Sequence, residues 1–471
     1  MSDIGQSAAR VTRSPTFKFF LIAFLIVLLL VPLVMVVGLV MEREGRSRDV
    51  VRDVARTWGG VQQITGPYLV VPYTIRVETQ EGDKVVQRLV ERRAVFLPED
   101  LSIGGDSASK VLQRSIFDVN VYTATLSLTG QFAAPDIQEV DPNAVSVRWR
   151  DALFVLALSD VAGLKEAATL NVDGGRHTLP FLPSAGVPGT NMSGIHARLA
   201  GAPSLADADG PLRSFGFQAN LVFTGSASLS FAPAARETRI EIASDWPHPS
   251  FMGAFLPVER DVRADGFSAK WRVPHLARSV PHSWSLAESG LDRFHNAQFG
   301  VTFYQPVDFY GLVTRAVKYG ILFLAAGFMG VFVLELVSNG RVHPVQYIFV
   351  GLAMVFFYVL LLSLAEHLGF TRAYAIASLA TGGMLSLYVG KALQSLRSGL
   401  LMAALFSALY GLLYLILRLE DYALLAGALL GFTALTTLMF ATLRIDWSGL
   451  GGPSPDRKAE LPYGEEEGVV V

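Results

Sequence analysis

The strongest constraint on this chain is an apolar run near its start, from Phe19 to Met41, that contains no charged residue. At ~1.5 Å per residue a helix of this length can cross the ~30 Å hydrocarbon core of a bilayer. A secretory signal peptide has a shorter apolar region that ends at a small-residue cleavage site, whereas this run continues into Glu42 and Arg43. We therefore expect an uncleaved membrane anchor over residues 19–41.

Comparable runs return only from residue 319 onward. Five further spans are expected there, within residues 319–443, and their short connections force neighbouring helices to run antiparallel. The expected spans are Tyr319–Val337, Tyr347–Leu364, Ala373–Val389, Gly399–Leu417 and Tyr422–Leu443. The sequence thus predicts an α-helical transmembrane bundle of six spans.

Basic residues predict the orientation of these spans, because they collect in cytoplasmic loops. With the N-terminus inside, most of them fall on the inner side, and the short outer loops keep only Arg372 and Arg418. Residues 1–18 and 444–471 are therefore predicted to be cytoplasmic, an N-in, C-in arrangement in which the segment between the first two spans is exported.

The exported segment, residues 42–313, has the alternating pattern of half-buried strands. Phe267, Ala269, Trp271 and Val273 alternate with polar residues, and turn clusters separate such runs. The fold class is therefore mixed: the bundle carries a large all-β, sandwich-like domain inserted between spans one and two. One sandwich and two in series both fit this pattern.

A short amphipathic helix is expected between the anchor and the first strand. Val50, Val51, Val54 and Trp58 fall on one face of a helix over Arg48–Trp58. That face should pack against another part of the protein.

Composition excludes several classes of function. The chain has no cysteine, which excludes disulfides, iron–sulfur clusters and thiol nucleophiles. Its formal net charge of −2 leaves no basic excess for a nucleic-acid partner. The low content of charged residues, 17%, agrees with the predicted bundle.

Several motifs resemble the CreD family of bacterial inner-membrane proteins, and the similarity runs from the first anchor to the last span. They are Ser244–Phe251, Gly253, Phe255–Pro257, Pro306–Tyr310, Arg315–Tyr319, Glu335, Arg341–Tyr347, Ser363–His367 and Glu420–Leu425. The resemblance implies a large periplasmic domain, control by a two-component regulatory pair, and links to envelope integrity, colicin tolerance and β-lactam response. It supplies no active site. Many relatives are expected to carry a basic residue after the aspartate at Asp160, and this chain lacks one.

Reaction signatures are missing from the sequence: we find no G-x-S-x-G, H-E-x-x-H, Walker or G-x-G-x-x-G motif. We therefore predict no catalytic, cofactor or metal site, and a non-enzymatic protein. His248, His275, His282 and His295 share one stretch of the exported domain, but their spacing fits no tight metal site, and we interpret them as loop histidines.

Asp245, Trp246, His248 and Phe251 form the sharpest motif of the exported domain. As a binding loop, two prolines would hold the backbone while the aromatic and polar side chains contact a ligand. As a structural feature, Trp246 would fill the core and the prolines would end a strand. The composition of the motif favours the structural interpretation.

A second candidate is a polar cluster at the membrane edge: Glu335, Arg341, His343, Gln346, Glu366 and His367. A carboxylate just inside a membrane is costly without a partner. We predict that Glu335 pairs with Arg341 or His343, and that the cluster serves as a polar latch or docking point. Topological anchoring by the basic residues is the alternative.

Small residues spaced four apart predict close helix packing in the bundle: Ser407 with Gly411, and Gly427 with Gly431. No ionisable residue lies near the middle of any expected span, which argues against ion-coupled transport. The favoured hypothesis is an integral membrane protein that binds an envelope component or a protein partner through its β domain. A transporter or lipid-handling permease, and a tethered periplasmic hydrolase, are the alternatives.

Overall fold

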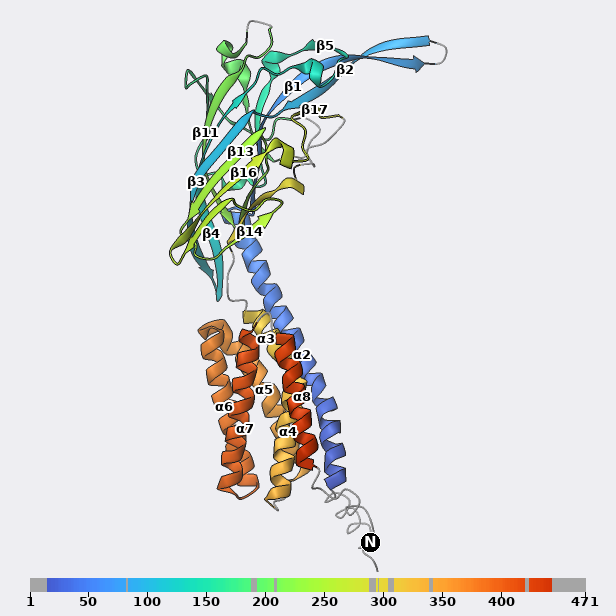
Figure 1. Ribbon diagram of the computed structural model, residues 1–471, viewed down its shortest axis with the longest axis vertical. Coiled ribbons are helices and arrows are strands. Elements are labelled where there is room, and N and C mark those ends of the chain that lie inside the picture. Colours follow the sequence, from blue (N-terminus) through green and yellow to red (C-terminus); the bar gives the residue numbers. More distant parts are fainter. Residues whose placement is uncertain are drawn as a thin grey trace, which may run out of the picture. The chain divides into compact units, whose positions relative to one another are not determined.

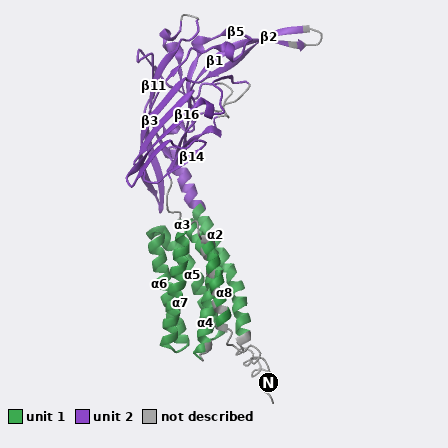
Figure 2. Cartoon of the chain, viewed as in Figure 1, with its two compact units in different colours: residues 1–44, 308–471 green, residues 45–307 purple. Residues whose placement is uncertain are grey.

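The computed structural model describes residues 15–81, 84–187, 193–206, 210–287, 294, 296–303, 309–338, 342–419 and 423–442. The chain separates into two compact units (Figure 2). Unit 1 contains Met1–Glu44 and Asp308–Val471, and unit 2 contains Gly45–Val307. Unit 2 holds the described strands, and unit 1 is helical.

Unit 2 consists of two β-sheets (Figure 1). The ten-stranded sheet has the order β14-β18-β12-β1-β6-β10-β9, with β2 and β5 also paired to β1 and β17 paired to β2. Its strands are β1 (Gln62–Glu81), β2 (Lys84–Phe96), β5 (Ala144–Val147), β6 (Leu153–Leu158), β9 (Leu182–Pro183), β10 (Gly194–Arg198), β12 (Ser228–Phe231), β14 (Pro249–Gly253), β17 (Ser283–Ser285) and β18 (Phe299–Phe303).

The second sheet has eight strands in the order β15-β16-β13-β3-β4-β11-β7-β8. Its strands are β3 (Asp100–Arg114), β4 (Phe117–Phe132), β7 (Thr169–Val172), β8 (His177–Pro180), β11 (Phe215–Ser226), β13 (Glu237–Ser244), β15 (Glu259–Arg263) and β16 (Gly266–Pro274). The 3₁₀ turns in the described part of the unit are η1 (Ile137–Glu139), η2 (Trp149–Asp151), η3 (Val161–Gly163), η4 (Leu199–Gly201), η5 (Pro203–Leu205) and η6 (His275–Ala277).

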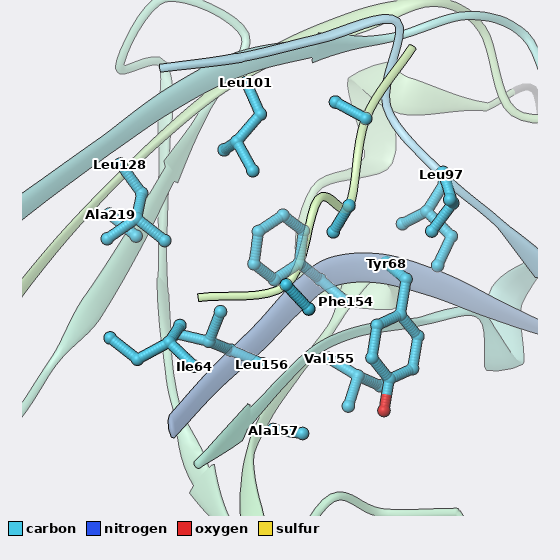
Figure 3. Packing of buried hydrophobic residues seen from close by; sticks show 14 of the residues in the cluster. Ile64, Tyr68, Leu97, Leu101, Leu128, Phe154, Val155, Leu156, Ala157 and Ala219 are labelled. Carbon is cyan, nitrogen blue, oxygen red and sulfur yellow. The ribbon is translucent and has the colours of Figure 1, made fainter. Parts of the chain in front are cut away.

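One apolar cluster joins the inner faces of the two sheets (Figure 3). Ile64, Tyr68 and Phe154 contribute from the ten-stranded sheet, and Leu101 and Leu128 from the eight-stranded sheet. Two layers that share a core are the arrangement of a β-sandwich. The predicted β-rich region is therefore confirmed.

The alternation read from β16 is confirmed residue by residue. Phe267, Ala269, Trp271 and Val273 are buried, whereas Lys270, Arg272 and Pro274 are exposed. The buried set faces the core because successive side chains of a strand point to opposite faces of the sheet.

The predicted amphipathic helix is the end of a longer helix, α2 (Pro15–Trp58), which also contains the anchor. Val54 is buried against Val119 and Val121 of β4, and Val50, Val51 and Trp58 pack around them together with Leu112 of β3. The apolar face predicted from the sequence therefore covers the outer face of β3 and β4.

Unit 1 contains α2 up to Glu44 and a group of C-terminal helices (Figure 1). These are α3 (Phe309–Lys318), α4 (Gly320–Val337), α5 (Pro344–Leu368), α6 (Phe370–Ala392), α7 (Leu396–Arg418) and α8 (Ala423–Thr442). The α3–α4 pair is bent by 49°.

The predicted number of spans needs correction. Among the described residues, four helices are long and apolar enough to cross a membrane, or five if the bent α3–α4 pair is one span. The expected sixth span forms α8, which is not among these candidates. About five spans, not six, are therefore supported.

The packing of α2 on the β domain generates a prediction about Val54. Val54→Ala removes buried methyl groups and should destabilise this contact by roughly 1–3 kcal/mol. Hydrogen exchange of residues 50–58 in the full-length protein should accelerate. Arg52→Ala, at an exposed position of the same helix, is the control, and equal exchange in the two variants would contradict the assigned contact.

Candidate functional site

Glu335, near the end of α4, lies in a buried polar cluster of unit 1. Its residue is only 4% exposed. The carboxylate pairs with Lys18 of α2 and accepts hydrogen bonds from the Tyr347 hydroxyl of α5 and the backbone N–H of Val342, each at 2.8 Å. We call Lys18, Glu335 and Tyr347 the Glu335 cluster. These bonds offset the free-energy cost of burying the Glu335 carboxylate at membrane depth.

Among the described residues, Glu335 is bonded to partners other than the predicted His343, and its pairing with Arg341 stays a prediction. His343 caps the start of α5: its ring Nδ1 accepts from Val345 N–H at 3.3 Å, and its own N–H donates to Gln346 Oε1 at 2.8 Å. These bonds form a capping box ahead of Pro344. His343 and Gln346 are thus occupied in starting the helix, and Arg341 lies outside the described residues.

Glu366, near the other end of α5, forms a second polar cluster. Arg43 of α2 holds its two carboxylate oxygens in a two-pronged arrangement, with Nε–Oε1 and Nη2–Oε2 distances of 2.7 and 2.5 Å. Tyr310 of α3 donates a third hydrogen bond at 3.2 Å. We call Arg43, Glu366 and Tyr310 the Glu366 cluster. His367, the next residue, is exposed.

The two clusters fasten α2 to the C-terminal helices at two levels. Lys18 and Arg43 are separated along α2 by about 38 Å, at ~1.5 Å per residue. This distance places them near the two edges of a bilayer of ~40–45 Å with its headgroup regions. Each carboxylate comes from a C-terminal helix and each cation from α2, so Glu335 and Glu366 are bonded within this chain, and the latch or docking role stays a prediction.

The segment around Asp160 supports the start of the first strand in unit 2. The Asp160 carboxylate accepts from Gly60 N–H and Ala162 N–H, both at 2.9 Å. Gln62 Nε2 donates to the carbonyls of Asp160 and Thr224 at 3.0 and 2.9 Å. Backbone N–H groups therefore donate to both carboxylate oxygens of this aspartate.

The Asp245–Phe251 segment connects the two sheets, since it runs from β13 to β14. Phe251 packs edge-on against Phe267 and Trp271, and Trp246 is half-buried against the same core. Asp245 Oδ1 accepts from Ser109 N–H of β3 at 2.7 Å. These contacts support the structural interpretation of the motif, and Asp245 and His248 keep exposed surface.

The small residues of the bundle fall into two environments. A Cβ added at Gly427 would lie 2.9 Å from the Tyr319 ring, so this glycine allows a close contact. Gly411 and Gly431 have no atom within 4 Å of that position. Ser407 and Gly411 line a cavity between α6 and α7.

His282 is the histidine with the most structured surroundings. Its Nε2 lies 3.2 Å from Glu99 Oε1, and its Nδ1 lies 3.5 Å from Arg278 Nη2. Burial lowers the pKa of His282 despite the Glu99 carboxylate, and burial with the nearby Arg236 lowers the pKa of Arg278 to about 10. Within the described residues no group of three or more His, Asp or Glu is placed to hold a metal ion. His295 lies outside those residues.

Sequence reasoning missed the cationic and phenolic partners of the two carboxylates. Lys18 and Arg43 flank the first apolar run, where basic residues indicate the orientation and the ends of a span. Tyr310 and Tyr347 lie within the family-like motifs, but nothing in their spacing links them to a carboxylate. The available signal was that two buried carboxylates require cations, and α2 supplies one at each end.

A long apolar helix, a two-sheet domain and a set of C-terminal apolar helices define a multi-pass membrane protein with a large β domain inserted after its first helix. The family profile described as "Inner membrane protein CreD" matches residues 14–448. Inner membrane protein CreD of Escherichia coli (strain K12) is 31% identical over 448 residues, which cover 94% of this chain and 95% of that protein. The chain therefore belongs to the CreD family and is an inner membrane protein.

The Glu335 cluster generates a double-mutant prediction. Lys18→Met leaves a buried carboxylate short of its cation and should cost about 3–5 kcal/mol of unfolding free energy. Adding Glu335→Gln removes that charge, so the double variant should lose less than the sum of the two single losses. Unfolding in mixed detergent micelles measures both effects.

An exposed ion pair of the same protein provides the control for this cycle. Asp49→Asn disrupts the Arg52–Asp49 pair, whose side chains are 69% and 67% exposed, and should cost at most ~1 kcal/mol. Losses from Lys18→Met and Glu335→Gln that simply add, within ~0.5 kcal/mol, would show that the two side chains are not coupled.

His282 generates a prediction about pH. Its pKa is lower in the folded protein than the ordinary value of ~6.5, so the unfolded chain binds a proton more readily there. Unfolding free energy should therefore fall as pH falls from about 7 through 6.5 and below. His282→Gln, which can still donate to Glu99 and accept from Arg278, should flatten this dependence.

The measurement is thermal unfolding followed by tryptophan fluorescence at pH values from about 7.5 to 5.5, above the range where most carboxylates titrate. His248→Gln, which changes an exposed histidine, is the control. A pH slope in His282→Gln equal to that of the unmodified protein would refute the assignment.

Proposed function

We propose that this protein is a non-enzymatic inner membrane protein that supports the cell envelope by binding a protein component through its β domain. The basic residues before the first apolar run favour a cytoplasmic N-terminus and hence an exported β domain. The family resemblance supports a role in envelope integrity and stress response. The helices of unit 1 serve as the anchor of the binding module.

The observation that carries this proposal is the long hairpin formed by β1 and β2. The two strands pair continuously from Leu69–Phe96 to Glu81–Lys84, and the hairpin projects from the body of unit 2 (Figure 1). Val85, Leu89 and Val90 on β2 are 65%, 68% and 39% exposed. Apolar side chains gathered on a projecting element are typical of a contact surface.

The edges of this hairpin also favour a protein partner. In the described residues, β5 pairs with β1 only as far as Ile75, and β17 pairs with β2 only from Ala94 onward. The distal parts of both strands therefore present unpaired backbone edges, to which an extended segment of another protein can add. Side chains such as Val85 and Leu89 would provide the apolar contacts for such a segment.

The Asp245–Phe251 segment supports the proposal less strongly than the hairpin. Trp246 and Phe251 contribute to the core, so their replacement would disturb the fold as well as any surface. The exposed His248 is the member of the motif that can be changed without entering the core.

A second candidate function, lipid handling, is favoured by one observation. A cavity of ≈660 Å³ lies between α6 and α7, both of which are candidate membrane spans. Its volume is in the range of pockets that hold small molecules. The cavity is the subject of the next subsection.

Site-specific photocrosslinking in living cells tests the binding proposal. A photoreactive amino acid at Val85 or Leu89 should form a defined adduct with an envelope protein. The same residue placed at Leu276, which is 87% exposed on η6, is the control for exposure alone. Leu89→Asp should remove the adduct and produce the same envelope sensitivity as deletion of the protein.

The folding of the variants must be compared alongside. Leu89→Asp is at an exposed position and should leave thermal unfolding within about 0.5 kcal/mol of the unmodified protein. Normal envelope resistance in cells that carry Leu89→Asp, together with identical adducts from positions 89 and 276, would overturn the proposal.

A further inference from the structure

The cavity between α6 and α7 is a groove along the two helices, and small residues line much of it. Beyond one end of the groove the helices are close together, since a Cβ added to Gly390 would lie 3.0 Å from the Gly399 Cα atom. Towards the other end the groove reaches Thr371 and Tyr414, and lining residues such as Leu379 and Gly411 are exposed. The cavity is lined by Thr371, Tyr374, Ala375, Ser378, Leu379, Gly382, Gly383, Ser386, Ala403, Phe406, Ser407, Tyr410, Gly411 and Tyr414.

Buried tyrosines at the base of the cavity hold the two helices in this arrangement. The Tyr374 hydroxyl donates to the Tyr410 carbonyl at 2.6 Å, and the Tyr410 hydroxyl lies 2.8 Å from Thr381 Oγ1. Both tyrosines are 4% exposed and pack against Phe357. A framework bonded in this way keeps the space open without a ligand, which lowers the free-energy cost of binding one.

The lining changes in polarity along its length. Leu379, Gly383, Ala403 and Phe406 offer a mainly carbon surface between two candidate spans, where lipid chains are the surrounding solvent. At the end near Thr371, Arg418 donates to the Tyr414 hydroxyl and to Thr371 Oγ1, at 3.0 and 3.1 Å. Its guanidinium also lies 5.4 Å from the centre of the Tyr414 ring.

Among the described residues, two basic side chains lie at this rim. Arg418 is positioned at the end of α7, and Arg372, one residue after Thr371, is exposed. No carboxylate is among the lining residues. Glu420 and Asp421 follow in the sequence but lie outside the described residues. A cationic rim above an apolar channel at membrane depth matches an anionic headgroup above an acyl chain.

We infer that the cavity between α6 and α7 binds an anionic phospholipid, with its phosphate at Arg418 and Thr371 and an acyl chain along Gly411 and Gly383. The inference stands apart from the proposed role of the β domain, because it concerns only residues of unit 1. Loss of the partner adduct at Leu89 would leave it untouched, and loss of lipid binding would leave the hairpin proposal untouched.

Two glycines allow the cavity to be filled without disturbing the protein around it. No atom lies within 4 Å of a Cβ added at Gly383 or Gly411, so leucine there should occupy the channel instead of displacing a neighbour. Gly38 on α2 is equally open but does not line the cavity. Gly38→Leu is therefore a matched control for adding a side chain to an exposed glycine of a membrane helix.

The experiment is native mass spectrometry of the full-length protein released from vesicles of phosphatidylethanolamine and phosphatidylglycerol in equal amounts. The unmodified protein and Gly38→Leu should retain one phospholipid, enriched in phosphatidylglycerol. Gly411→Leu and Gly383→Leu should lose it. Arg418→Gln should keep a lipid but lower the preference for phosphatidylglycerol by about fivefold, the factor expected from one basic side chain near an anionic surface.

A second measurement distinguishes binding of a lipid from binding of a free anion, and the oligomeric state distinguishes it from docking of another helix. Phosphatidylglycerol added to delipidated protein should raise its melting temperature, and inorganic phosphate should not. Equal lipid retention in Gly411→Leu and the unmodified protein would overturn the inference, as would stabilisation by phosphate alone. A change of oligomeric state in Gly411→Leu, with lipid retention unchanged, would assign the cavity to helix docking and equally overturn it.

Discussion

The burial of two carboxylates in an apolar helical bundle is the constraint on which the arrangement of unit 1 depends. Glu335 and Glu366 each receive one cation from α2 and one tyrosine hydroxyl from a C-terminal helix. A membrane gives helices little hydrophobic reason to associate, so polar contacts and close packing must determine which helices meet. Because both cations lie on α2, these bonds select α2 as the partner of α4 and α5.

Much of the fold was predictable because it follows from local patterns. Period-two alternation gave the strands, as β16 shows from Phe267 to Val273, and the apolar face of Arg48–Trp58 gave the helix that covers β3 and β4. The number of spans was less predictable. The expected span at residues 319–337 is the second part of a bent pair whose first part, α3, contains Arg315 and Lys318. Hydropathy also does not separate a crossing from other uses of an apolar helix such as α8.

The candidate site was predictable only in part, because its bonds join distant segments. That Glu335 needs a polar partner follows from electrostatics alone, but the cation that pairs with it, Lys18, is 317 positions away in the sequence. His343 instead begins α5, where a helix start needs acceptors for its free N–H groups. Likewise, the four-residue spacing of Ser407 and Gly411 did not show that these residues line a groove, since that depends on how α6 packs beside α7.

The separation of the bonded residues along the chain has a consequence for biogenesis. Lys18 and Glu335 are 317 positions apart, and Arg43 and Glu366 are 323 apart. During synthesis, α2 must enter the membrane and the whole β domain must be made before either carboxylate exists. Until then, Lys18 and Arg43 lie at the edges of the bilayer without their carboxylates, and their long side chains can reach water. Insertion of the first helix and assembly of the bundle are thus separate events in time, and the nascent protein passes through a stage in which a single helix holds it in the membrane.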